Sequence, residues 1–283
     1  MRYDLHIHTA ASDGSDTPAG LAQKVLAAGL ELFSVTDHDT IAGALEMEAL
    51  IPAGVGFIRG VEFSCVSPGG KCHILGYGYD PANPVFRSAL EEGAQLRREK
   101  LERRIDHLRE RFGVLLTAEE LRWLRSLKSP GKPHLAGLLV KRGLAPDRGS
   151  AIRRFLSGVP GRDRIDSETA IGAIRAAGGI AVWAHPLGGE GEKRLTQVPL
   201  EQRLAALLSE GIQGLECYYS RYSRGESELL LGYARAHNLI VTGGSDYHGI
   251  NKKDIQLGQL GTESGEWSID TAPLSGIILQ KAR

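Results

Sequence analysis

Residues 3–14 read YDLHIHTAASDG, so two histidines flank one isoleucine and an aspartate follows five residues after the second histidine. Residues two apart in a strand face the same side, so a strand over residues 3–8 places His6 and His8 side by side. Buried imidazoles without partners are costly, and a metal ion is the partner that this pair predicts. A histidine pair this short also occurs on polar strand faces. The rest of the chain therefore has to decide between the two interpretations.

Seven short runs rich in β-forming residues alternate with helical patterns, a rhythm typical of a parallel sheet in an α/β protein. The chain has 283 residues, a length at which an α/β barrel is commonly one domain. We therefore predict an α/β fold with a barrel of seven strands. The runs are YDLHIHT, LFSVTDH, VGFIRGVEFS, KCHILGYGY, GIAVWAHP, IQGLECYY and LIVTGGSDYH.

The rhythm breaks between the fourth and fifth runs. Residues 86–165 show no convincing strand and begin with a long, highly charged helical pattern. We predict that they form a helical insertion, a lid or substrate subdomain, in a barrel made of residues 1–85 and 166–283. The last 20 or so residues, from Gly261, are poorly patterned and receive no role.

The charges are balanced overall but unevenly distributed. The chain has 34 basic and 34 acidic residues, yet residues 90–165 hold 18 Lys and Arg against 10 Asp and Glu, and the remainder holds 16 against 24. A net charge of zero argues against a protein whose surface is basic overall and binds nucleic acid. An acidic body suits a site for divalent cations, and a basic segment above it suits a phosphorylated substrate. An ordinary solvated helix explains most of the basic charges equally well.

The sequence shows no pattern typical of a disulfide framework, a membrane span or a leader, and this indicates the cellular compartment. The three cysteines form no CxxC pattern, which favours small buried residues in a reducing compartment over a disulfide framework. No stretch approaches the ~18 apolar residues of a membrane span, and the N-terminus shows no basic and apolar leader. We expect a cytoplasmic protein with no membrane partner, and its oligomeric state is left open.

Residues able to bind metal gather at the predicted strand ends, the edge at which barrel enzymes build their active sites. His73 lies near the start of its run but can reach the same edge. The set is His6, His8, Asp13, His38, Glu62, His73, His185, Asp246 and His248. Nine such side chains are too many for one zinc ion and suit two or three divalent ions with a bridging carboxylate. We expect manganese, with iron or zinc as alternatives.

These motifs resemble the polymerase and histidinol phosphatase (PHP) phosphoesterases over nearly the whole chain. The segments DLHIHT with Asp13, TDHDT, GVEFS, HILGYG, AHP and GSDYHG stand in the order of that family. The resemblance implies a distorted seven-stranded barrel, a centre of three ions and a metal-bridging hydroxide as nucleophile. It implies one ion held by His6, His8, Glu62 and Asp246, a second by Glu62, His73 and His185, and a third by Asp13, His38 and His248.

The insertion resembles the branch with 3′,5′-nucleoside bisphosphate phosphatases and 5′-to-3′ oligoribonucleotide exonucleases. That branch typically reads Gly-Arg-Pro-His where this chain has GKPH, with Lys132, and a Gly-Lys-Pro-Ala-Tyr stretch is replaced here by GVPGRDR. Lysine offers a point charge where arginine offers a fork. The resemblance implies a metal-dependent phosphoric ester hydrolase acting on a phosphate monoester of a nucleotide, either a bisphosphate or a short 5′-phosphorylated RNA.

Several residues near the predicted metal centre have more than one possible role. His134 is a candidate for phosphate binding, with Lys132, or for the acid that protonates the leaving oxygen, and it fits a helix-capping role equally well. Asp37 and Asp39 flank His38 and are expected to orient it. Glu216 could orient a ligand or be an ordinary strand-end carboxylate.

Two other functions compete with this one. A phosphodiesterase or cyclic-phosphate hydrolase acting on a sugar phosphate would use the same centre. A non-catalytic metal-binding PHP module is the alternative outside the enzymes, although every expected ligand position is filled.

Overall fold

Seven strands follow one another in the order β1-β2-β3-β4-β6-β7-β8 in a curved, nearly closed sheet. The computed structural model describes residues 1–189, 193–263, 265 and 267–280. Each predicted run overlaps one of these strands, so the α/β barrel is confirmed. They are β1 (Tyr3–Ile7), β2 (Leu32–Val35), β3 (Gly56–Ser67), β4 (Gly70–Tyr77), β6 (Ile180–Trp183), β7 (Gly214–Tyr219) and β8 (Ile240–Gly244).

The barrel closes where β8 meets β1. The amide of Asp246 donates to the carbonyl of His6 at 2.8 Å, and the amide of His8 donates to the carbonyl of Tyr247 at 2.9 Å. A β-carbon at Gly244 would collide with the side chain of His6, so glycine is needed for this approach. The closure therefore brings the ends of the first and last strands, with their histidines, to one place.

The expectation of a wholly parallel sheet is wrong at β4. This strand runs antiparallel to both β3 and β6, because Pro68 and Gly69 return the chain in a tight hairpin. A hairpin between adjacent strands needs only a short turn, whereas parallel pairs need a crossover helix. The reversal pairs His73 with Ser64 of β3. A residue near the start of β4 thus lies beside the middle of β3, where Glu62 stands.

Two further strands escaped prediction because both are very short. β5 (Ile165–Asp166) pairs with β3 in parallel, and β9 (Ile278–Gln280) pairs with residues 56–58 of the same strand in the antiparallel sense. The C-terminal segment from Gly261, to which no role was given, therefore adds an edge to the sheet. Residues 264, 266 and 281–283 of that segment lie outside the described part.

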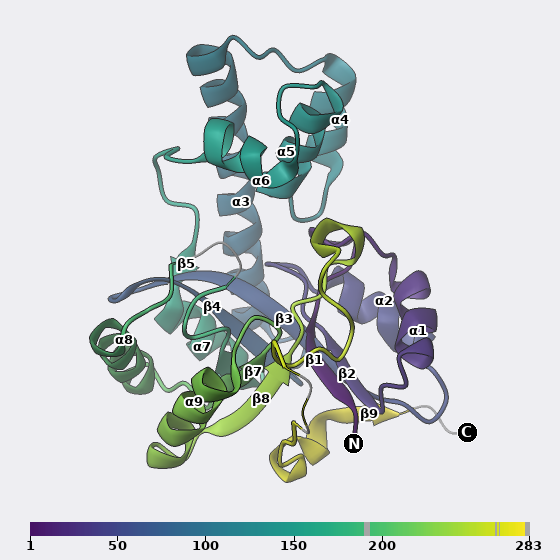
Figure 1. Ribbon diagram of the computed structural model, residues 1–283, viewed down its shortest axis with the longest axis vertical. Coiled ribbons are helices and arrows are strands. Elements are labelled where there is room, and N and C mark those ends of the chain that lie inside the picture. The colour runs from purple at the N-terminus through teal and green to yellow at the C-terminus, as the bar shows by residue number, and fades with distance from the viewer. Residues whose placement is uncertain (190–192, 264, 266, 281–283) are drawn as a thin grey trace.

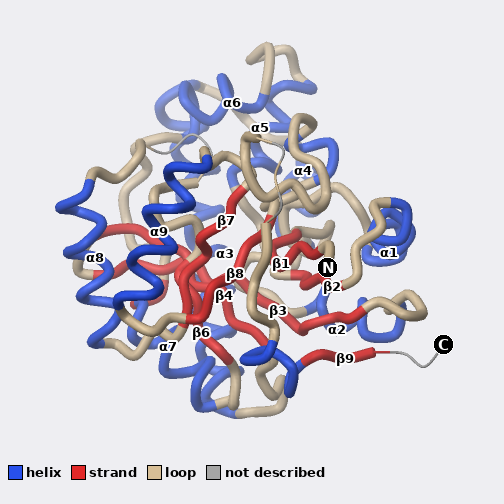
Figure 2. The backbone as a smooth tube through the Cα atoms, turned by 60° about the horizontal axis from the view of Figure 1, so that its bottom comes forward, coloured by secondary structure: helices blue, strands red, loops and turns tan. Residues whose placement is uncertain are grey.

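Helices cover the outside of the barrel (Figure 2). Leu21 and Val25 of the first helix, for example, are buried against Phe33 and Val35 of β2, and such burial of about 1.5–3 kcal/mol per large side chain fixes the helix to the sheet. The outer helices are α1 (Pro18–Ala27), α2 (Ala42–Leu50), α7 (Ser167–Ala176), α8 (Gln197–Ser209) and α9 (Arg224–Ala236). Two 3₁₀ turns follow β8, namely η2 (Gly249–Lys252) and η3 (Ala272–Ile277).

A 29-residue helix, α3 (Pro84–Phe112), rises from the barrel to a small group of helices (Figure 1). The side chain of Asn83 caps its start, and Gly113, with a φ of 64°, ends it. Its first half packs in the barrel core through Phe86 and Leu96. Its second half shares a separate apolar cluster with the elements that follow, which are α4 (Ala118–Ser126), α5 (Lys132–Lys141), α6 (Arg148–Ala151) and η1 (Ile152–Leu156).

None of the helices in the described ranges combines the length and the apolar character that crossing a bilayer requires.

Candidate metal centre

Four buried side chains meet where β1 and β8 end. The Nε2 atoms of His6 and His8 lie 3.3 and 3.2 Å from Oε2 of Glu62. The same nitrogens lie 3.7 and 3.3 Å from Oδ1 of Asp246. All four side chains are at least nine-tenths buried. The geometry brings together the residues that the sequence analysis gives to one ion.

The other carboxylate oxygen of Glu62 faces two further histidines. Oε1 lies 2.8 Å from Nδ1 of His73 and 3.1 Å from Nε2 of His185, and these two nitrogens are 3.2 Å apart. His73 reaches this place because β4 is antiparallel to β3. Glu62 therefore presents one oxygen to each of two ligand groups, the geometry that a bridging carboxylate requires.

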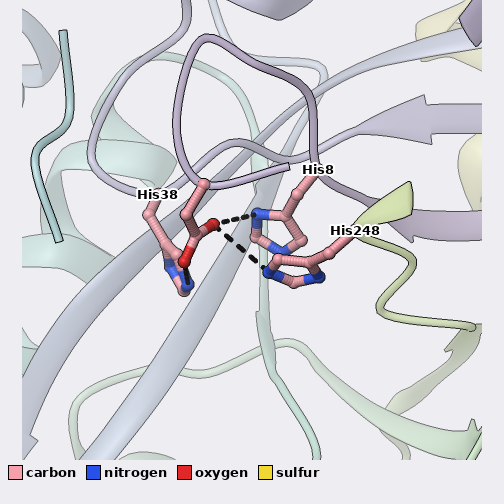
Figure 3. A group of neighbouring side chains, drawn as sticks. His8, His38 and His248 are labelled. Atoms are coloured by element: carbon pink, nitrogen blue, oxygen red, sulfur yellow. Dashed lines mark ion pairs between the residues drawn. The ribbon is translucent and has the colours of Figure 1, made fainter. Parts of the chain in front are cut away.

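A third group surrounds Asp13 in the loop after β1. Figure 3 shows its three histidines, His8, His38 and His248. Nε2 of His248 lies 3.2 Å from Oδ1 of Asp13, and Nε2 of His38 lies 3.9 Å from Oδ2. His8 also borders this group, with its Nδ1 3.8 Å from Oδ1 of Asp13. Nδ1 of His38 lies 3.0 Å from Glu62, so His38 stands between the third group and the bridging carboxylate.

Four buried polar atoms at the centre have no hydrogen-bond partner in the described structure. They are Nε2 of His6, Nε2 of His8, Nδ1 of His38 and Oε2 of Glu62, and the three nitrogens all lie within 3.3 Å of that one oxygen. Buried donors and acceptors are almost always satisfied, so a cluster of unsatisfied ones needs an explanation. Nitrogen and oxygen atoms that converge without hydrogen bonds fit divalent cations.

The ionisation state differs among the side chains of the cluster. Burial, assisted by the positive charges of Lys252 and His8, lowers the pKa of His248 to about 4. Burial lowers the pKa of His73 as well. Although burial opposes ionisation of Glu62, His38 and His73 outweigh it and hold its pKa well below the usual range. His73 and His248 are thus neutral and Glu62 is ionised, which are the ligand forms that metals require. Although burial opposes the change, nearby carboxylates raise the pKa of His6 and raise that of His8 to about 9, so these two rings lose a proton when an ion binds.

Glu216 orients two of these side chains. Its Oε1 accepts from Nδ1 of His6 at 2.9 Å, and its Oε2 accepts from the amide of His185 at 2.6 Å. A hydrogen bond at Nδ1 leaves the lone pair of Nε2 of His6 directed at the centre. Of the two interpretations of Glu216, the structure supports the orienting one.

Replacing Glu216 with glutamine is therefore expected to weaken metal binding without abolishing it. Loss of such an orienting partner typically costs about tenfold to a hundredfold in metal affinity or activity. Manganese titration of the Glu216→Gln variant, followed by activity at saturating metal, measures the change. An unchanged metal affinity would show that Glu216 is an ordinary buried carboxylate.

Asp246 is held by partners that the sequence motifs do not reveal. Its Oδ2 accepts from the hydroxyl of Tyr219 at 2.9 Å and from the ammonium of Lys252 at 2.6 Å. Oδ1 remains directed toward His6 and His8. The backbone of Asp246 has a φ of 57°, and that of His185 has a φ of 29°. Such strained positions in non-glycine residues cluster at functional sites.

Asp37 and Asp39 do not play the role predicted for them, because each carboxylate binds another part of the site. Asp37 accepts from the amide and hydroxyl of Thr9 at 2.8 and 2.6 Å and from the hydroxyl of Ser12 at 2.5 Å. Asp39 accepts from the amide of Ser64 and from Arg97. Asp37 therefore fixes the loop that carries Asp13, and Asp39 ties α3 to β3.

His134 caps the start of α5, as one of its two interpretations predicts. The amide of Gly131 donates to Nδ1 of His134 at 3.0 Å, so the neutral ring carries its proton on Nε2. Burial lowers the pKa of His134, although the nearby Asp13 opposes the change. Lys132, two residues earlier, is half-buried. The ring also contacts the backbone of Ser12, in the loop that carries Asp13, which places His134 beside the third ligand group.

A cavity of about 560 Å³ lies beside His134, between α4, α5 and η2. Trp123 and Arg148 are in its lining, together with Asn251. The amide of Asn251 also donates to the carbonyl of Asp13 at 2.8 Å, which joins this cavity to the third ligand group. No sequence pattern indicates this cavity, because its walls come from three separate segments.

Comparison with known sequences agrees with this geometry. Residues 4–120 match the family described as the PHP domain. A 5′-3′ exoribonuclease of Haemophilus influenzae is 31% identical over 252 residues, which are 87% of this chain and 90% of that protein. A 3′,5′-nucleoside bisphosphate phosphatase of Chromobacterium violaceum is 31% identical over 251 residues, covering 87% of this chain and 86% of that protein.

The fold has a close counterpart among solved structures. A protein from Bifidobacterium adolescentis, described as a candidate metal-dependent phosphoesterase, superposes with a TM-score of 0.80 at 28% sequence identity. The superposition covers 97% of this chain and 94% of the other.

Proposed function

This chain belongs to the PHP family and is a metal-dependent phosphoester hydrolase, and from that premise we propose that its substrate is a phosphate monoester on a nucleotide. The two substrate types are a 3′,5′-nucleoside bisphosphate and a short RNA with a 5′-phosphate. They are what two relatives, the phosphatase and the exoribonuclease, are named for. Three buried free cysteines support a further proposal, a cytoplasmic location.

We assign the three ligand groups to up to three divalent ions, manganese first, with iron or zinc as alternatives. The observation that carries this assignment is the set of converging buried atoms that lack hydrogen bonds. Ions bound there would neutralise the phosphoryl oxygens and acidify a water molecule, the chemistry of metal-dependent ester hydrolysis. The ligands proposed are His6, His8, Asp13, His38, Glu62, His73, His185, Asp246 and His248.

The segment 86–165 is proposed to act as a lid that brings two side chains to the substrate. His134, whose Nε2 carries the proton, can donate to a phosphate oxygen or to the leaving oxygen. Lys132, two residues earlier in the chain, adds a positive charge. The cavity beside His134 supports a nucleoside as the rest of the substrate, because a base can stack on an aromatic ring such as that of Trp123.

A small substrate panel tests the proposal. With the manganese-loaded enzyme, we expect kcat/KM for adenosine 3′,5′-bisphosphate or a short 5′-phosphorylated RNA to exceed that for p-nitrophenyl phosphate by about tenfold or more, since remote contacts contribute binding energy. A cyclic phosphate of a sugar and an aryl phosphodiester complete the panel. A higher kcat/KM for either of these would favour the phosphodiesterase. If the enzyme hydrolysed no substrate of the panel, that result would contradict the assignment of a catalytic centre.

A further inference from the structure

One face of α3 carries three cations. Arg97, Lys100 and Arg104 are spaced by three and four residues, which places them on the same side of the helix. The first two have acidic partners, because Arg97 pairs with Asp39 and the ammonium of Lys100 lies 3.1 Å from Asp163. The third cation, Arg104, has no such partner.

Arg104 is buried without a direct hydrogen-bond or ion-pair partner among the described residues. Its side chain is 8% exposed, and its Nε is buried without a hydrogen-bond partner. Across the described ranges, the guanidinium takes part in no hydrogen bond or ion pair. Burial, together with repulsion by Arg97, lowers its pKa to about 10. A buried and unpaired charge is expensive, so its retention points to a ligand of opposite sign.

Two more cations from other segments stand near Arg104. Burial lowers the pKa of Lys132, and Arg104, Lys71, Lys100 and Arg164 lower it further, so all four charges lie close to that ammonium. Arg164 donates from Nη1 to the carbonyl of Cys72 at 3.1 Å, while its Nε is buried without a hydrogen-bond partner. Asp163, already paired with Lys100, is the carboxylate that faces this group. Positive charge is therefore in clear excess.

We propose that Arg104, Lys132 and Arg164 form a binding site for a second phosphate of the substrate. This inference rests on the proposed function, because it assumes that the other phosphate lies at the metal centre. One guanidinium group can bind two oxygens of a phosphate at once. Each such contact between opposite charges is strong when it is shielded from water. Lys132 connects the site to α5 and thus to His134.

The position of the cations relative to the metal centre supports the proposal. A narrow cleft is lined by Lys71 and Arg164 together with His73 and His185. Arg164 therefore lies in the same cleft as two histidines of the second ligand group. Arg164 lies in the GVPGRDR segment, so a stretch that departs from the usual pattern of the branch supplies a charge of its own.

The first test measures anion binding without turnover. Thermal melting is compared in sodium sulfate and in sodium chloride at equal ionic strength for three metal-loaded proteins: the wild type, Arg104→Met and Arg111→Met. Arg111→Met is the matched control, because it removes an exposed arginine of the same helix. We expect sulfate to raise the Tm of the wild type and of Arg111→Met more than chloride does, and Arg104→Met to lose that excess. In chloride, Arg104→Met should be at least as stable as the wild type, because it removes an unpaired buried charge.

Two results would overturn the anion site, namely a wild type that sulfate and chloride stabilise equally, or an Arg104→Met variant that keeps the excess. If Arg104→Met melts well below the wild type in chloride, Arg104 has a structural role, and Arg164→Met then provides the same comparison. Loss of the sulfate excess in Arg164→Met would support the site, and its retention would refute it.

The second test asks whether the anion is part of the substrate. The ratio of kcat/KM for adenosine 3′,5′-bisphosphate to that for p-nitrophenyl phosphate is expected to fall about tenfold to a hundredfold in Arg104→Met, mainly through KM, and to stay constant in Arg111→Met. An unchanged ratio in Arg104→Met would refute the second-phosphate role. If the wild type does not hydrolyse the bisphosphate, the proposed function fails, while the sulfate comparison still decides whether the anion site exists.

Discussion

The Glu62→Gln variant is expected to lose at least one metal ion and about a thousandfold or more in kcat/KM, because metal ions contribute several kcal/mol to stabilising the charge of the transition state. Glutamine has nearly the same shape as glutamate, so the buried space is conserved. It removes the negative charge that the two oxygens of Glu62 present to His6 and His8 on one side and to His73 and His185 on the other.

The readouts for this variant are elemental analysis of the purified protein and steady-state kinetics on the preferred substrate of the panel. Glu110→Gln is the matched control, since Glu110 is an exposed glutamate on α3 and should change neither quantity. Full metal retention with unchanged turnover in Glu62→Gln would show that Glu62 does not bridge two ions.

The sequence predicted the barrel and its candidate ligands well because both depend on local patterns. Alternation in residues 3–8 places His6 and His8 on one side of β1, and the structure has their ring centroids 5.2 Å apart. Strand runs bounded by turn residues locate all seven barrel strands. Parallel strands end at one edge of a barrel, so residues at the ends of separate runs could be placed together without knowing their distances.

Features that depend on contacts distant in the sequence could not be predicted. The reversal of β4 was missed because a strand read alone carries no direction, although Pro68 and Gly69 between two runs were a usable turn signal. The sequence predicts that Asp37 orients His38, its neighbour in the chain. The hydrogen-bond partners of the Asp37 carboxylate are instead Thr9 and Ser12, which are more than 20 residues away. No local signal links Lys252 to Asp246 or shows that Arg104 is buried.

Removing the metal ions is expected to destabilise the protein as well as to inactivate it. A ligand present at a thousand times its Kd stabilises the folded state by about 4 kcal/mol, which corresponds to a fall in Tm of roughly 8–16 °C when it is withdrawn from a chain of this size. Without cations, the buried oxygens and nitrogens around Glu62 lose the partners proposed for them. Dialysis against a chelator followed by thermal melting measures the loss.

The control for chelation is recovery. Adding manganese back should restore both the Tm and the activity, whereas magnesium chloride at the same ionic strength tests for a general salt effect. Because a thiolate or disulfide site would respond differently to reductant, the melts are repeated with dithiothreitol, which should change nothing. A chelated protein that melts at the temperature of the untreated one would show that the cluster does not need ions to hold its shape.

Metal content tests the central claim most directly. Protein purified from cells supplemented with manganese, or reloaded after chelation and desalted, is analysed for manganese, iron and zinc by elemental analysis against its concentration. Nine converging ligands predict about two to three equivalents of divalent metal per chain, a number that follows from the usual three or four protein ligands per ion with one shared carboxylate. One equivalent or fewer in fully loaded protein would contradict the multinuclear centre.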